Sequence, residues 1–158
     1  MIVEDRYIPS TEAVKFIAFI RACATEDNAN AEIHYRLADK YFSDSKQIVI
    51  ESFRGSAKST LMEWLVLYTA VMGELPGFGN VGFIAFVGDS AENGVKSFFR
   101  NLAAKIDRSE LLRQTLTIGR KTDAEMELIN ADGKELYLKG FGAGTNIRGV
   151  RYKNLRPS

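Results

Sequence analysis

The sequence predicts an α/β fold in which a mostly parallel central sheet is flanked by helices. Two apolar runs bounded by polar residues, "KQIVIESF" at 46–53 and "VGFIAFVG" at 81–88, are typical of buried strands. Each run precedes a segment with helical periodicity, and further strand-like residues follow at 124–141. Strands that alternate with helices in this way favour a parallel sheet with helices on its faces.

The helices are predicted from the spacing of apolar residues. The segment 9–24 predicts the first helix, which begins after a cap at Ser10 or Thr11. A short second helix is expected at 32–42. Residues 58–73 are apolar nearly all round, which predicts a helix buried on several sides. A fourth helix would align on one face the apolar residues Val95, Phe98, Phe99, Leu102, Ala103 and Ile106.

The remaining elements are a break and a hairpin. The segment "ELPGFGN" at 74–80 ends the third helix. Residues 124–130 and 134–141 predict two strands, joined by a turn in which Asp132-Gly133 supplies the positive φ.

Composition indicates one soluble globular domain. The chain has 158 residues, of which 46% are apolar and 26% charged, enough for one packed core. The single Cys23 is expected to be a small buried residue near a helix end, with a reactive thiol as the alternative. Neither a signal peptide nor an apolar run of membrane-spanning length is evident, so the expected location is the cytoplasm.

Charge is distributed unevenly along the chain. The net charge is only +1, but residues 139–158 contain five basic residues and no acidic one: Lys139, Arg148, Arg151, Lys153 and Arg156. This stretch is either a solvated basic tail or a surface that meets phosphates.

The segment "SFRGSAKST" at 52–60 nearly matches the phosphate-binding loop G-x-x-x-x-G-K-[ST]. Alignment on Lys58 and Ser59 puts Ser52 and Ala57 at the two glycine positions. A predicted strand directly before the loop and a predicted buried helix directly after it favour a phosphate site over an ordinary turn.

This loop has the groups that bind nucleotide phosphates. Backbone amides would come from Gly55, Ser56, Ala57, Lys58, Ser59 and Thr60. Lys58 would neutralise the outer phosphates, and the Ser59 hydroxyl is the expected Mg²⁺ ligand. Ala57 places a methyl near the phosphates and makes left-handed torsions costly by roughly 1 kcal/mol, so a working but weaker site is expected.

With an arginine four places before the lysine, this loop resembles the deviant Walker A of the large terminase subunit of tailed bacteriophages. That ATPase drives double-stranded DNA into the procapsid. The resemblance runs from about Ile33 onward, through "HYRLADKYF", "FIAFVGDSAENGVKSFFRNL" and "GFGAGTNIRG". It implies a P-loop NTPase fold of the ASCE type, ATP and Mg²⁺ as cofactors, and viral DNA packaging in the host cell cytoplasm.

The resemblance also implies residue roles. Arg54 matches an arginine implied to sense or stabilise the γ-phosphate, although it could simply pin the loop to a carboxylate. Arg148 matches an arginine that in related motors acts in trans on a neighbouring subunit's ATP; DNA or solvent contact is the alternative. His34 and Tyr35 lie where the family often carries an adenine-reading glutamine, which is missing here.

Family members continue with a Walker B strand that ends in two acidic residues, and then with a nuclease domain. Neither is expected within this chain, since Asp89 is expected to cap a helix. The chain is therefore interpreted as an N-terminal piece, with a helical segment at 1–30 and a partial ATPase domain at 31–158. Such a piece should bind ATP with little turnover. The implied partners are double-stranded DNA, the portal protein, the small terminase subunit and a homo-oligomeric ring, with a monomer in isolation.

Two other interpretations remain open. The chain could be a different P-loop NTPase, such as a small kinase or a helicase-like ATPase. It could also be a non-hydrolysing interaction module whose degenerate loop binds no nucleotide.

Overall fold

The computed structural model describes residues 6–24, 32–43, 58–76, 78–88 and 94–142. The first strand expected from the sequence, at 46–53, lies outside these ranges. No helix in the described ranges is both long and apolar enough to cross a membrane.

Five helices are described, and four of them lie where the apolar spacing predicted them. Their bounds are α1 Thr11–Cys23, α2 Glu32–Tyr41, α3 Lys58–Met72, α4 Lys96–Arg108 and α5 Glu110–Thr115. The predicted cap of α1 is confirmed, because the Ser10 side chain accepts a hydrogen bond from the backbone N–H of Ala13 at 3.1 Å.

The described strands form two sheets. Their bounds are β1 Glu74–Leu75, β2 Gly79–Asn80, β3 Phe83–Gly88, β4 Leu116–Lys121, β5 Glu125–Asn130 and β6 Glu135–Gly142. β1 and β2 form a two-residue ladder within the segment predicted only as a break. The predicted hairpin is confirmed in β5 and β6, with Gly133 at φ 81° in the turn.

The main sheet corrects the predicted fold class. Its strand order is β3-β6-β5-β4, in which only β3 and β6 are parallel, while β6-β5 and β5-β4 are antiparallel. The expectation of a P-loop NTPase fold with a mostly parallel sheet is therefore wrong for the described strands. The physical reason is the meander from β4 to β6: short turns join these strands, and a short turn can only reverse the chain.

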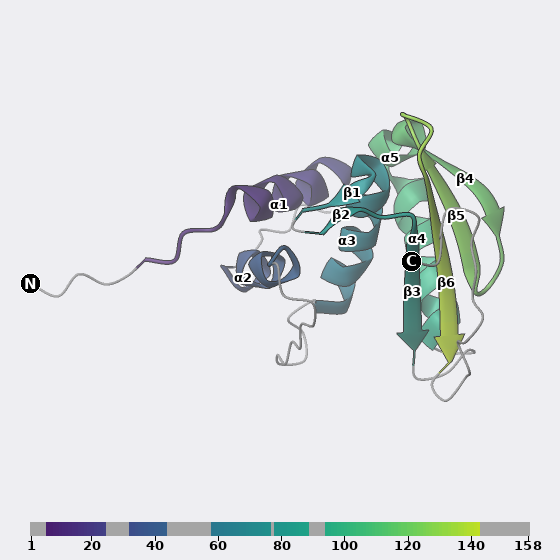
Figure 1. Cartoon of the computed structure of the whole chain (residues 1–158), viewed down its shortest axis with the longest axis horizontal. Coiled ribbons are helices and arrows are strands. Elements are labelled where there is room, and N and C mark those ends of the chain that lie inside the picture. The colour runs from purple at the N-terminus through teal and green to yellow at the C-terminus, as the bar shows by residue number, and fades with distance from the viewer. Residues whose placement is uncertain (1–5, 25–31, 44–57, 77, 89–93, 143–158) are drawn as a thin grey trace, which may run out of the picture.

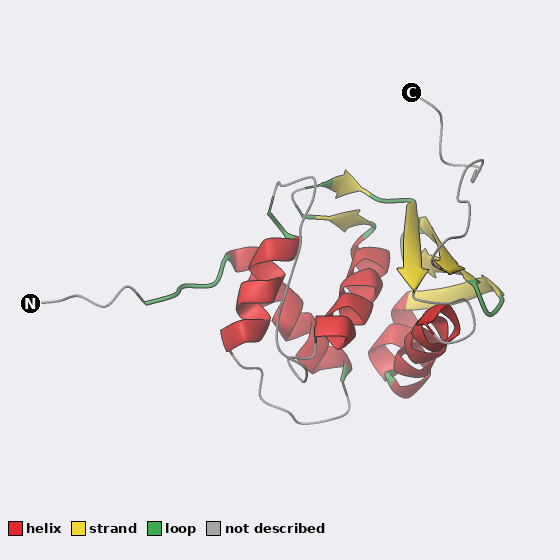
Figure 2. Cartoon of the chain, turned by 90° about the horizontal axis from the view of Figure 1, so that it is seen from below, coloured by secondary structure: helices red, strands yellow, loops and turns green. Residues whose placement is uncertain are grey.

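Helices cover one face of this sheet. Figures 1 and 2 show α4 and α5 against the sheet, with α1 and α2 on the far side of α3. α3 contacts both α4 and β5, so it joins the helices α1 and α2 to the main sheet and its covering helices. A single core of buried apolar residues runs through these layers.

Gly140 on β6 lets α4 approach the sheet closely. A Cβ built there would lie 2.3 Å from Val95 Cγ1 and 2.9 Å from Phe99 Cε2, both shorter than any real contact. Only glycine fits this position without movement of the helix.

Cys23 matches its predicted place at the buried end of α1. Burial raises the pKa of its thiol, and a hydrogen bond with Ser109 opposes this shift only in part. A raised pKa disfavours the thiolate, so the thiol has the character of a structural residue.

Candidate functional site

The predicted phosphate loop meets the described structure at the first turn of α3. This helix begins at Lys58 and continues through Ser59 and the exposed Thr60. The other predicted loop and catalytic residues lie outside the described ranges: Ser52, Arg54, Gly55, Ser56, Ala57 and Arg148, together with Asp89.

The first turn of α3 is electropositive. It contains no acidic residue, and its first residue is a lysine. The unpaired amides of a helix start carry a partial positive charge, and an anion placed there gains roughly 0.3–1 kcal/mol. From Leu61 to Ala70 every residue of α3 except Met62 is buried, so the core fixes the direction in which this turn points. The arrangement can bind an anion.

A buried ion pair joins α3 to α4 close to this turn. Lys105 Nζ lies 3.4 Å from Glu63 Oε1 and 5.6 Å from the centroid of the Trp64 ring. Glu63 is only 6% exposed, and among the described residues no hydrogen-bond donor reaches its Oε2. Burial of a half-satisfied carboxylate is costly, so Glu63 depends strongly on Lys105.

The residues expected near adenine lie on α2. His34 and Tyr35 are both half-buried, and Tyr35 packs against the hydrophobic core. Core packing accounts for the position of Tyr35 without a ligand. The adenine role of both residues stays a prediction.

A polar cluster fixes the N-terminal end of α1 to α2. Asp39 accepts hydrogen bonds from the hydroxyls of Tyr7 and Ser10, and the Arg36 guanidinium lies 4.2 Å from the Tyr7 ring centroid. Burial, the hydrogen bond to Asp39 and the charge of that carboxylate raise the pKa of Tyr7 to about 12. Burial acts to raise the pKa of Asp39, but the hydrogen bonds from Ser10 and Tyr7 outweigh it and lower that pKa.

One end of the molecule gathers the carboxyl ends of the parallel strands. Gly88 of β3 and Gly142 of β6 are paired in register, so both strands end at the same edge. Figure 1 shows α3 beginning at this same end of the molecule. Ligands of sheets with parallel strands bind where such strands end.

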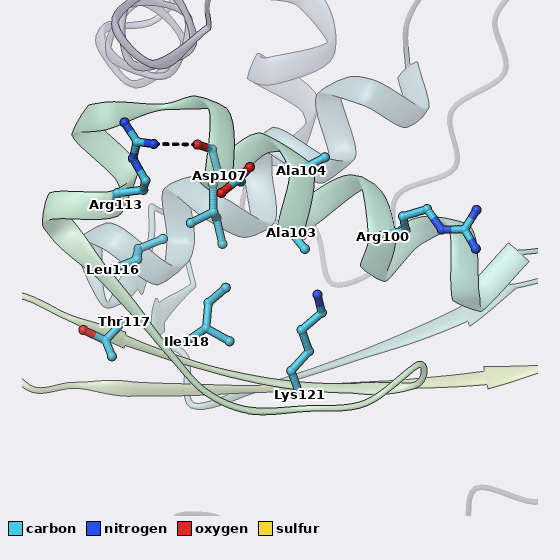
Figure 3. A pocket seen from close by; sticks show the side chains of 10 residues that line it. Arg100, Ala103, Ala104, Asp107, Arg113, Leu116, Thr117, Ile118 and Lys121 are labelled. Atoms are coloured by element: carbon cyan, nitrogen blue, oxygen red, sulfur yellow. Dashed lines mark hydrogen bonds between the residues drawn. The ribbon is translucent and has the colours of Figure 1, made fainter.

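A second candidate site, which sequence reasoning missed, is a pocket of about 720 Å³ between α4, α5 and β4. Arg100, Arg113 and Lys121 line it together with one acid, Asp107 (Figure 3). It was missed because neither α5 nor β4 was predicted. The available signal was charge: residues 96–121 contain seven Lys or Arg residues against two acidic ones.

No cluster of three or more metal-ligating side chains exists within the ranges that the structure describes. Comparisons with family models, with curated proteins and with solved structures find no match to this chain.

Proposed function

We propose that this chain binds ATP with Mg²⁺ at the start of α3 and forms the nucleotide-binding part of a DNA-packaging ATPase similar to the large terminase subunit. Nucleotide binding is supported by the local sequence and by the helix that follows it, and it does not require a mostly parallel sheet. The DNA-packaging role is supported by the resemblance of residues 52–60 and the segments around them.

The observation that carries the proposal is the lysine at the first position of α3. A cation at the positive end of a helix is electrostatically unfavourable, and no acid in the first turn offsets it. A bound phosphate removes this conflict, because it interacts favourably with both the lysine and the helix amides. Burial of α3 from Leu61 to Ala70, Met62 excepted, holds the helix backbone in a fixed direction at this end.

The proposed roles follow from the chemistry of each group. The amides from Gly55 to Thr60 would bind phosphate oxygens, Lys58 would neutralise the β- and γ-phosphates, and Ser59 would contribute a hydroxyl to Mg²⁺. Arg54 would stabilise the γ-phosphate. Arg148 would act on the ATP of a neighbouring subunit, which requires a ring of subunits. Bound Mg²⁺ would supply further neutralisation of the phosphate charge.

The test is a titration of the purified chain with a fluorescent ATP analogue and Mg²⁺. Lys58→Ala should weaken binding about tenfold or more, because a charge-assisted hydrogen bond contributes roughly 1.5–3 kcal/mol. Lys40→Ala is the matched control, since Lys40 is exposed on α2, and it should leave affinity unchanged.

Equal affinity for the chain and for Lys58→Ala would remove the site. Ala57→Gly should bind as well as the parent chain or better if the methyl crowds the phosphates. Thermal melting of each variant verifies that the fold is intact.

A further inference from the structure

We propose that the pocket between α4, α5 and β4 is a binding site for the phosphate backbone of DNA. The proposal deepens the function proposed above and rests on it for the choice of DNA among phosphate polymers. The observation that carries it is the presence of three cationic side chains, Arg100, Arg113 and Lys121, among the residues that line one pocket (Figure 3).

The pocket exists because α4 presents small residues to the end of the sheet. Arg100, Ala103, Ala104 and Asp107 follow i, i+3, i+4, i+7 spacing and so share one face of α4. The two alanine side chains end at Cβ and cannot fill the space beside β4, which is the last strand in the sheet order. Larger apolar residues also line the pocket: Ile106, Leu116 and Ile118.

The cations of this pocket have no carboxylate partners among the described residues. Arg100 and Lys121 are exposed, and no carboxylate in the described ranges lies within 4.0 Å of either. By contrast, nearby basic residues are paired: Lys96 with Asp123, Lys105 with Glu63 and Arg120 with Glu125.

Two lining residues fix one end of the pocket. Arg113 donates a hydrogen bond to the backbone carbonyl of Asp107 at 3.0 Å, which holds its guanidinium in place and leaves other N–H groups free to donate. The Asp107 carboxylate reduces the charge of the lining and should weaken the binding of an anion.

The length of the pocket favours phosphates in series over a single phosphate. Arg100 lies at one end of the pocket, and Arg113 lies at the other, where it donates a hydrogen bond to the Asp107 carbonyl (Figure 3). Arg100 and Asp107 are seven residues apart on α4, which corresponds to a rise of about 10 Å. DNA carries one charge per roughly 3.4 Å along each strand, so one strand can contact cations at both ends. None of the described residues that line the pocket is aromatic, so they offer no surface for base stacking. Binding should therefore be independent of sequence and strongly dependent on salt.

The experiment is fluorescence anisotropy with a short labelled DNA duplex, over a series of salt concentrations and without nucleotide. The double variant Arg100→Gln/Lys121→Gln removes two contacts, while Arg113 stays because it supports the joint between α4 and α5. Each lost contact should reduce the slope of log K against log salt by about 0.9, and affinity near 0.1 M salt by about eightfold. Asp107→Asn should have the opposite effect and tighten binding.

The matched control is Lys15→Gln/Lys40→Gln, which removes the same charge from exposed positions on α1 and α2. It should change the affinity less than twofold and leave the slope unchanged. The proposal is overturned if both double variants behave alike, or if inorganic triphosphate competes as well as unlabelled DNA.

The two proposals fail separately. The pocket variant should retain ATP binding, and Lys58→Ala should retain this DNA affinity. A chain that binds DNA at this pocket but does not bind nucleotide would therefore contradict only the first proposal.

Discussion

Replacement of Gly140 by alanine tests the packing of α4 against β6. The new Cβ would lie 2.3 Å from Val95 Cγ1, so the two atoms must separate by about 1 Å to reach the 3.4 Å of an ordinary contact. Val95 and Phe99 are fully buried, and neither can rotate into solvent. Overpacking of this kind costs roughly 1–3 kcal/mol. For a chain of this size, that loss lowers the melting temperature by roughly 2–12 °C.

Calorimetry or urea unfolding of Gly140→Ala measures the loss. Val95→Ala in the same chain removes the methyl that the new Cβ would meet, so the double variant should be more stable than the sum of the single effects predicts. Gly119→Ala is the control on β4, where the nearest atom is the end of the flexible Glu127 side chain at 3.1 Å. A Gly140→Ala protein as stable as the parent would refute the reasoning, as would strict additivity with Val95→Ala.

Three further predictions concern charged or titratable groups. Lys105→Ala should destabilise the fold by about 3 kcal/mol in urea unfolding, because it leaves the Glu63 carboxylate buried without its partner. Addition of Glu63→Leu to this variant should restore much of the lost free energy of unfolding. If Lys105→Ala costs no more stability than Lys15→Ala, this account is contradicted. Asp39 has a lowered folded-state pKa, so its contribution to stability should be complete above about pH 5 and should disappear as the pH falls through that pKa. Tyr7 has a raised pKa, so its contribution should be complete below about pH 10 and lost as the pH rises through about 12. Asp39→Asn should flatten the acid limb of stability against pH, and an unchanged limb would show that other groups control it.

The helices were largely predictable from the sequence, because each buries a long apolar face. Apolar residues on one face from Val95 to Ile106 predicted α4, and a segment that is apolar on all sides predicted α3. α5 was not found, because six residues are too short for a periodic pattern. β4 was not found either, since only its first residue, Leu116, is buried and its last three are exposed.

The sequence pattern could not predict the direction of the strands. Alternation of strand and helix led to a parallel sheet, but direction depends on which strands become neighbours, and the missed β4 places β5 in a meander. The candidate site divides in the same way. The start of α3 at Lys58 followed from local sequence, whereas the proposed DNA pocket brings together α4, α5 and β4, of which α5 and β4 were not predicted.

The pairing of β3 with β6 has a consequence for the order in which this protein folds. Phe83 pairs with Tyr137, a separation of 54 residues, while β5 and β6 meet across a tight turn. The entropy of closing the longer loop must be overcome before its contacts stabilise the chain, so the meander should form first and β3 should join it late. The edge formed by Gly88 and Gly142, at the end of the molecule where α3 begins, would then be completed near the end of folding. A nucleotide that stabilises this edge would act on the last step of assembly.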